Sequence, residues 1–479
     1  MHKQYIIEKE KFLRITGNWI EIIQNNLCPA LDIAQYTDLP SVKKKETPTE
    51  WFNLRERIDD YKKRIIHGRL WEMCLSKGNA IRCFGDAEKL GEGIKKAQAK
   101  LNLARVYDKQ YGEEEKINVI NNYRASYKIY KNHPTHQFIS EAVLCKIGLA
   151  NFIRRALKQS DSALDECKKA KEMLELAKKQ DEKYKLAYSQ YLNCLGLIYS
   201  NLGSKYIDQC IDLFAKSLEY KEEIGDIKGI AETENDIGLT IIKKGNIDIK
   251  EISNAISHLK KSLEINESIG NYIGAARNCR NLGLCYINLI NLVKNKNAKK
   301  ENFQLAKESY KSSIDYWHMM VGDPPIEEVS EYKYRLGELE VNYGGELEVN
   351  YEDFNEGIKF LQEVKGRWYK LGKLHNCARS LDLLRKAYNS TEYIGSKGTK
   401  DVESTIDEII RIYINVLGDK NKLKQMKRDE NIFEEVVQIL KRTEETIIGL
   451  KEYDHKADNL DKIENLREIM GETASKSNK

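Results

Sequence analysis

Two short clusters bring together residue types that metal sites and covalent catalysis use. His133 and His136 lie three residues apart and could begin a metal site, but no cysteine or carboxylate cluster nearby completes a ligand set. Cys377 follows His375 by two residues, and a thiol nucleophile needs a base within reach. Because two residues of separation on one helix point the side chains apart, we expect Cys377 to fill a packing position. We expect the two-histidine segment to be a turn between helices.

The common signatures of nucleotide hydrolysis and metalloproteolysis are missing from the sequence. It contains neither a G-x4-G-K-[ST] phosphate loop nor an H-E-x-x-H zinc motif. The 10 cysteines are scattered without a C-x2-C pair, so they indicate reduced core residues rather than a zinc or redox site. We therefore predict that the chain is not an enzyme and that it uses no cofactor and no metal.

The charge pattern is that of a solvated surface. The 79 Lys and Arg residues and the 74 Asp and Glu residues are interleaved along the chain, which leaves a net charge of only +5. Nucleic-acid binding predicts a continuous basic stripe, so we expect no nucleic acid partner. No apolar run approaches the roughly 20 residues that cross a bilayer, and the N-terminal MHKQYIIEKEKF lacks the apolar region of a signal peptide. We therefore expect a cytoplasmic protein without membrane contact.

Composition favours a helical array over one compact core. At 479 residues the chain exceeds the size at which single cores stop growing. It is rich in Lys, Glu, Leu, Ile and Ala, which suit helices, and it has only 6 prolines, none of them between Thr135 and Asp323.

An internal repeat organises the elements. Residues 224–241 (IGDIKGIAETENDIGLTI) and 269–286 (IGNYIGAARNCRNLGLCY) nearly superimpose at an offset of 45 residues. Each ends in a glycine-centred phrase, at Gly238 and Gly283, and the same phrase occurs earlier at Gly196. Because helices approach closely only where one contributes almost no side chain, these glycines predict tightly packed helix pairs.

A second phrase of one small, one large and one small residue follows each glycine phrase. Its spacing of four and then three residues keeps the three side chains on one helical face. The three phrases are Cys210, Phe214 and Ser217; Ala255, Leu259 and Ser262; and Ala306, Tyr310 and Ser313.

Together the two phrases resemble the tetratricopeptide signature, W-x2-L-G-x2-Y followed by A-x3-F-x2-A. Weaker copies extend the resemblance to about residues 90–390. The small positions are 104, 148, 196, 238, 283, 337 and 385, so the units run to 42–54 residues where the standard unit has 34. They resemble the long repeats of kinesin light chains, LGN-type adaptors and Rap-type peptide-responsive regulators, which share the join I-G-D-x-x-G-x-A. The resemblance implies an all-α fold, a right-handed tetratricopeptide-like superhelical solenoid of about seven helical hairpins.

The ends of the chain lack the signature. We expect a helical cap or bundle in residues 1–90, with a helix at Trp51–Met73 and a linker at Tyr36–Thr49, before the array at residues 91–390. A C-terminal helical extension at residues 391–470 should contain helices at about 401–416, 430–452 and 456–471, before a disordered tail at 471–479. The exact tandem copy of GELEVNY at 337–343 and 345–351 predicts a local duplication taken up by a longer helix or a loop.

In the family that the chain resembles, the first helix of each unit lines a concave groove. The residues three before the small position are then Asn193, Asn235 and Arg280, with Arg277 one turn earlier. An asparagine can donate and accept at once, so a row of them suits the amides of an extended peptide, and the arginines suit a carboxylate. The same rule adds Gln190, Leu197, Glu232, Leu239, Leu284, Asn288, Tyr334 and Glu338. The alternative is that the asparagines cap or bridge neighbouring helices.

The resemblance implies a scaffold or adaptor that binds a protein or peptide partner in this groove, alone or as a non-catalytic subunit of a larger complex. A ligand- or peptide-responsive switch that controls a separate effector, as in Rap-type regulators, is the alternative. The two-lysine, two-asparagine clamp by which some relatives hold a C-terminal carboxylate is not matched.

Overall fold

The structure is a computed structural model of the chain. It describes Tyr61, Arg64, Ile65 and Gly68 and then residues 77–108, 113–133, 138–176, 182–244, 246–319, 326–343, 347, 351–389, 396–419, 423, 430–450, 453 and 455–470. The expected Trp51–Met73 helix, the Tyr36–Thr49 linker and the 471–479 tail lie outside these residues, apart from the four isolated ones.

Seventeen α-helices make up the described part of the chain, and no strand occurs in it. The earlier helices are α5 (Lys77–Leu90), α6 (Gly93–Tyr107), α7 (Glu113–Lys131), α8 (Ile139–Ala156), α9 (Ser160–Leu174), α10 (Glu182–Leu202), α11 (Ile207–Glu223), α12 (Ile227–Ile242), α13 (Ile249–Ser268) and α14 (Tyr272–Leu292). The later helices are α15 (Lys296–His318), α16 (Ile326–Tyr343), α17 (Tyr351–Lys370), α18 (Leu374–Tyr388), α19 (Ser396–Leu417), α21 (Glu430–Gly449) and α22 (Lys456–Met470). The all-α prediction is confirmed, as are the three helices expected after the array.

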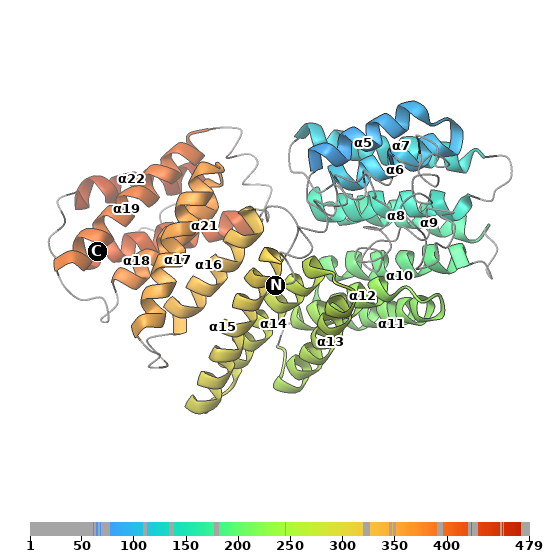
Figure 1. Cartoon of the computed structure of the whole chain (residues 1–479). Helices are drawn as coiled ribbons and strands as arrows, with labels where there is room; N and C mark the ends of the chain where they lie inside the picture. The colour runs from blue at the N-terminus through green and yellow to red at the C-terminus, as the bar shows by residue number, and fades with distance from the viewer. Residues whose placement is uncertain are drawn as a thin grey trace, which may run out of the picture. The chain divides into compact units, whose positions relative to one another are not determined.

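The described helices belong to two compact units. The first comprises the chain up to Leu292 with Asp315–Pro324, and the second comprises Val293–Ile314 with the chain from Pro325 on. Within the first unit the helices pack as sequential pairs, α6 with α7, α8 with α9, α10 with α11 and α12 with α13, each pair followed by the next (Figure 1). Within the second unit α16 packs on α17, α17 on α18 and α18 on α19. Sequential pairing of this kind is the tetratricopeptide-like arrangement that the repeat predicts.

The repeated join I-G-D-x-x-G ends one pair and starts the next. Gly225 adopts φ +67°, and the N–H of Asp226 bonds to the Lys221 carbonyl five residues back at 2.9 Å, which closes α11 with a Schellman turn. The Asp226 carboxylate then accepts from the Gly229 N–H at 2.9 Å and caps α12. A Cβ at Gly229 would lie 2.0 Å from that carboxylate, so the two glycines and the aspartate of the join each have a local cause.

Close approach of the paired helices depends on the small positions. A Cβ on Gly196 would lie 2.7 Å from the ring of Phe214, and one on Gly238 would lie 2.7 Å from Leu259. Both partners are the large residues of the second phrase, and both are fully buried. The predicted alternation of small and large side chains is therefore what allows α10 to pack on α11 and α12 on α13.

The last residue of the second phrase adds a hydrogen bond that the pattern does not show. In three pairs a serine hydroxyl of the second helix donates to the carbonyl seven residues before the small position of the first helix. The bonds run from Ser126 of α7 to Ala97, from Ser217 to Ser189 and from Ser262 to Ala231, at 2.8, 2.8 and 2.6 Å. All three serines are buried, so each hydroxyl fixes the sliding position of its two helices.

Gly148 of α8 leaves room for Tyr123 of the preceding pair, because a Cβ there would lie 2.5 Å from that ring. One assignment of the repeat is wrong. Position 385, assigned as small, is a buried arginine, and its guanidinium pairs with Asp382 at 2.8 Å. Asp382 also pairs with Arg442 of α21 at 2.6 Å, so the last degenerate repeat is joined to the C-terminal helices by charge.

The second unit has its own core of residues from α16 to α22, in which Trp368 and Tyr413 are the largest buried side chains. The first GELEVNY copy forms the end of α16, and its Glu340 is buried against Lys307 with a nitrogen–oxygen distance of 3.0 Å. Most of the second copy lies outside the described residues.

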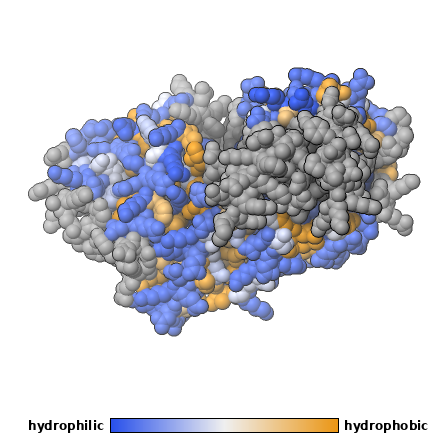
Figure 2. All heavy atoms as spheres, in the orientation of Figure 1, coloured by the Kyte–Doolittle hydropathy of each residue, from blue (hydrophilic) through white to orange (hydrophobic). Residues whose placement is uncertain are grey.

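The eight described cysteines are free and buried, in line with a packing role. None of the described helices combines the length and the apolar character that a membrane crossing requires. On the face shown in Figure 2, hydrophilic residues cover most of the described surface, and hydrophobic residues form smaller areas between them.

Glycine-to-alanine exchange should separate packing from helix propensity. Gly196→Ala pushes a methyl group into the Phe214 ring, so we expect it to lower the free energy of unfolding by about 1–2 kcal/mol. Gly85, in the middle of α5, has no neighbouring atom within 4 Å of the position that a Cβ would take, so Gly85→Ala should raise that free energy by about 0.5–1 kcal/mol. Urea unfolding followed by circular dichroism measures both, and equal effects at the two sites would contradict the packing argument.

Candidate functional site

The first helices of three successive pairs present matching residues on one side. The face combines Gln190, Asn193 and Leu197 of α10, Glu232, Asn235 and Leu239 of α12, and Arg277, Arg280 and Leu284 of α14. All nine side chains are half-buried or exposed, whereas their neighbours along each helix are mostly buried. We call these nine residues the ladder face. It has an outer polar row, a middle row of Asn193, Asn235 and Arg280, and a leucine row.

The first member of the middle row is bonded to the next helix. Asn193 donates its Nδ2 to the Thr233 hydroxyl at 3.2 Å and to the Asp236 carboxylate at 3.1 Å. Thr233 is fully buried and also accepts from the buried Lys221 ammonium at 2.6 Å. Asn193 therefore joins α10 to α12 through a buried polar cluster.

The second member repeats this arrangement one pair further on. The Oδ1 of Asn235 accepts from Asn278 Nδ2 at 3.2 Å and from Asn281 Nδ2 at 2.7 Å. Both α14 asparagines are only 1% exposed, so Asn235 is the acceptor that makes their burial tolerable. Asn281 in turn accepts from Arg280 through Nε at 3.2 Å and Nη2 at 3.0 Å. Both asparagines thus bridge neighbouring helices, which was the alternative to peptide contact.

Each of these asparagines still has one half of its amide to offer. Asn193 uses its Nδ2 group, and Asn235 uses its Oδ1 atom. Among the described residues nothing bonds to Asn193 Oδ1 or to Asn235 Nδ2, and both side chains are half-buried. The ladder face thus offers an acceptor on α10, a donor on α12 and a guanidinium on α14.

The side chains of the polar row and the leucine row form fewer contacts within the protein than those of the middle row. Glu232 and Arg277 are exposed, and neither forms an ion pair within the described part of the chain. Leu284 is 39% exposed, while Leu197 and Leu239 are half-buried, so the leucine row is an apolar strip at the surface. Asn288, the remaining residue assigned on α14, is half-buried one turn beyond Leu284.

Asp236 is the ionisable group beneath the middle row. Burial raises its pKa to about 6, against the opposing effects of the Asn193 hydrogen bond and the positive charges of Lys221 and Arg154. The nearby Glu232 raises it further. Burial also lowers the pKa of Lys221 and of Arg154, so this cluster holds its charges at a cost in stability.

The site residues assigned in the second unit are differently placed. Tyr334 is 3% exposed, with its ring centroid 5.3 Å from that of Trp368 and the Arg379 guanidinium 4.7 Å above it. Its side chain is covered by the protein and lines no open surface in this structure. Glu338 is half-buried and pairs with Arg335 at 2.9 Å.

The residue types that could support catalysis are used for packing. Cys377 is fully buried, and burial raises its thiol pKa to about 12, far from the range of a nucleophile. His375 instead contacts Glu435 of α21 at 3.2 Å. His133 lies edge-on to Phe138 with centroids 4.7 Å apart, and His136 lies outside the described residues. No group of three or more His, Cys, Asp or Glu side chains in the described segments could hold a metal ion.

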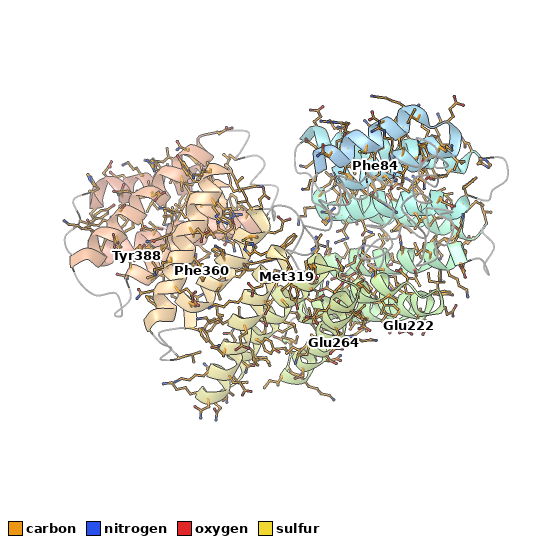
Figure 3. All side chains as sticks on the ribbon, viewed as in Figure 1. Phe84, Glu222, Glu264, Met319, Phe360 and Tyr388 are labelled. Carbon is orange, nitrogen blue, oxygen red and sulfur yellow. The ribbon has the colours of Figure 1, made fainter. Side chains whose placement is uncertain are left out.

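In the second unit, ion pairs and hydrogen bonds connect side chains of α16, α17 and α18. Lys333 of α16 pairs with Glu363 at 2.8 Å and lies 5.8 Å from the ring of Phe360, and Gln362 donates to Tyr388 at 2.7 Å. Figure 3 labels Phe360 and Tyr388 in this unit and Phe84 among α5 to α7.

Sequence reasoning missed Thr233, Asp236, Asn278 and Asn281, which complete the bonds of the middle row. One signal for two of them was present, because Asn278 and Asn281 lie three positions apart and so share one side of α14. Their burial could not be inferred, since polar residues in that pattern equally suit the exposed side.

Two substitutions of Asn235 should show how much its Oδ1 acceptor, as opposed to its side-chain volume, contributes to the free energy of unfolding. Asn235→Ala leaves the Asn278 and Asn281 amide donors buried without an acceptor, so we expect a loss of about 1–3 kcal/mol in unfolding free energy. Asn235→Asp retains an oxygen acceptor at the same place and should lose clearly less. Chemical unfolding measures both variants, and equal losses would mean that the amide bonds contribute nothing.

Asp236 should make stability depend on pH. Its folded pKa of about 6 lies above the ordinary 3.8, so the folded chain holds this proton more tightly, and the resulting stability is lost as pH rises from about 4 to about 6. Asp236→Asn removes this titration. We expect the variant to gain about 2 kcal/mol relative to wild type between pH 4.5 and pH 7.5, as measured by urea unfolding. A difference that does not change with pH would contradict this assignment.

No family model matches the chain, and no curated protein matches it in sequence. Solved structures do match. The chain is similar to a signal transduction ATPase with a tetratricopeptide repeat sensor from Pyrococcus horikoshii, at 14% identity and a TM-score of 0.47, over 78% of this chain and 57% of that one. It therefore spans little more than half of that ATPase.

The chain is also similar to aspartyl phosphate phosphatase F from Bacillus subtilis, at 14% identity and a TM-score of 0.40, over 80% of this chain and 85% of that one. A Rap protein complexed with competence and sporulation factor matches at 13% identity and a TM-score of 0.41, over 86% of this chain and 98% of that one. The likeness to these tetratricopeptide proteins concerns the helical repeat architecture.

Proposed function

We propose that the chain is a non-catalytic adaptor that binds an extended polypeptide segment across the ladder face. The observation that carries the proposal is the divided use of the middle row. Asn193 and Asn235 each use one half of the side-chain amide to bond to a neighbouring helix. The other half, the Oδ1 acceptor of Asn193 and the Nδ2 donor of Asn235, can bond to a partner. A peptide backbone offers N–H and C=O groups whatever its sequence, so these two positions can pair with its main chain.

The inter-helix bonds favour binding because they fix the side chains beforehand. A free asparagine loses rotamer freedom when it binds, whereas Asn193 and Asn235 are already held by two hydrogen bonds each. Immobilising a side chain on binding costs about 0.5–1.5 kcal/mol, and this cost is reduced for groups ordered in the free protein.

The leucine row supplies the apolar contact that a stable complex needs. Leu284 is the most exposed of the three leucines, and it lies on the same helix as Arg280. A partner segment with one apolar side chain directed at this row would bury surface that water now contacts.

A ligand-responsive switch is the second candidate, and the buried polar network favours it. The first helices α10, α12 and α14 are linked by hydrogen bonds as well as by apolar contacts. A ligand that takes over one of these bonds would change how α14 is held against α12, which couples binding to helix position.

The proposal is tested by selection of peptides from a random decapeptide library on the purified chain. We expect a family of peptides that share an apolar residue and bind wild type, and we expect Leu284→Glu to weaken them about 10-fold or more because a charge then faces the apolar contact. Fluorescence anisotropy with the labelled peptides measures the change.

A matched control uses the same substitution at an apolar residue away from the face. Ile249 is 49% exposed at the start of α13, so Ile249→Glu should leave both the fold and the binding unchanged. If no peptide is selected, or if the two variants weaken binding equally, the ladder face is not the binding site.

A further inference from the structure

The last helix of the ladder face has an unbalanced charge. Arg277 and Arg280 are the only charged residues of α14, whose 21 residues contain no Asp or Glu. Arg277 is exposed and forms no ion pair or hydrogen bond with the described residues. Arg280 contacts only the neutral oxygen of Asn281 within the same part of the chain.

The corresponding helices of the second unit balance their cations internally. Arg335 of α16 contacts Glu331 at 3.0 Å and Glu338 at 2.9 Å, and Arg379 of α18 contacts Glu435 at 2.7 Å. Among the described residues, the two guanidinium groups of α14 therefore lack the anionic partner that Arg335 and Arg379 have. An arginine at a binding face that pairs with no anion of the described residues can bind the anion of another molecule.

The geometry of the pair suits a carboxylate. Arg280 follows Arg277 by three positions, which places the two arginines on one side of α14, about one turn apart. The bonds from Arg280 Nε and Nη2 to Asn281 hold its guanidinium in place, and the remaining N–H groups still lie in the donor plane. A carboxylate can accept two parallel bonds from such a fork.

We infer that the partner segment carries a carboxylate that binds between Arg277 and Arg280, near one end of the stretch that contacts the ladder face. This inference rests on the proposed function and adds the chemistry and register of its ligand. Packed helices lie about 8–10 Å apart, and an extended peptide rises about 3.3 Å per residue, so about three peptide residues separate successive contacts. The contacts from Asn193 through Asn235 to Arg280 then span about seven residues.

A peptide fits this surface better than a nucleic acid does. The exposed Glu232 of α12 lies one helix away in the same row as Arg277 and would repel a continuing phosphate backbone. Leu284 continues the face on the other side of Arg280 with an apolar surface. One localised negative charge beside an apolar side chain satisfies all three residues.

Two random decapeptide libraries that differ only in whether Asp and Glu are allowed test the inference. We expect the acid-containing library to yield tighter binders, with the acid near one end. Replacing that acid by its amide should weaken binding to wild type about 10-fold or more. Synthesis of each peptide as a C-terminal acid and as a C-terminal amide distinguishes a terminal carboxylate from a side chain.

Arg277→Ala and Arg280→Ala should bind the acid and the amide peptides with equal affinity, whereas Lys250→Ala, an exposed cation on α13, should retain the discrimination. Selected peptides without an acid preference, still weakened by Leu284→Glu, would overturn this inference and leave the proposed function standing. Failure of both libraries would overturn the two together.

Discussion

Hydrogen bonds of the asparagines Asn193 and Asn235 link α10 to α12 and α12 to α14, and the ladder face depends on them. Asn235 accepts from two α14 asparagines that are almost wholly buried, so sliding α14 along α12 would leave two donors unpaired in a region that excludes water. Apolar packing alone tolerates small shifts, whereas a buried amide pair has few acceptable geometries. The same side chains that align the helices therefore also fix the half-amides of Asn193 and Asn235 that form no bond within the described residues.

Local features of the repeat could be predicted from the sequence because their causes are local. The I-G-D-x-x-G join contains every residue that its conformation requires. These are a glycine at positive φ, a capping carboxylate and a glycine that leaves space for the carboxylate. The small and large phrases likewise predict which helices approach closely, as Gly196 and Phe214 do. The position of the middle row on one side of three helices followed from the same periodicity.

Contacts between repeats could not be predicted in this way. An asparagine suits a partner, a cap or a neighbouring helix equally well, so the bonds of Asn193 with Thr233 and Asp236 emerge only when the helices are placed. Tyr334 occupies the equivalent register in the second unit yet is buried, because Trp368 and Arg379 close over it. Arg385 stands at a small position of the repeat, and no repeat motif encodes its pairing with Asp382 or the pairing of Asp382 with Arg442 of α21.

The most direct test of this account is a crystal structure of the chain with a selected peptide bound. The account predicts that Asn235 keeps both bonds from Asn278 and Asn281 through Oδ1 while its Nδ2 donates to a peptide carbonyl, and that a peptide carboxylate lies between Arg277 and Arg280. A peptide seated on the second helices, or an Asn235 side chain turned away from α14 to reach the peptide, would contradict it.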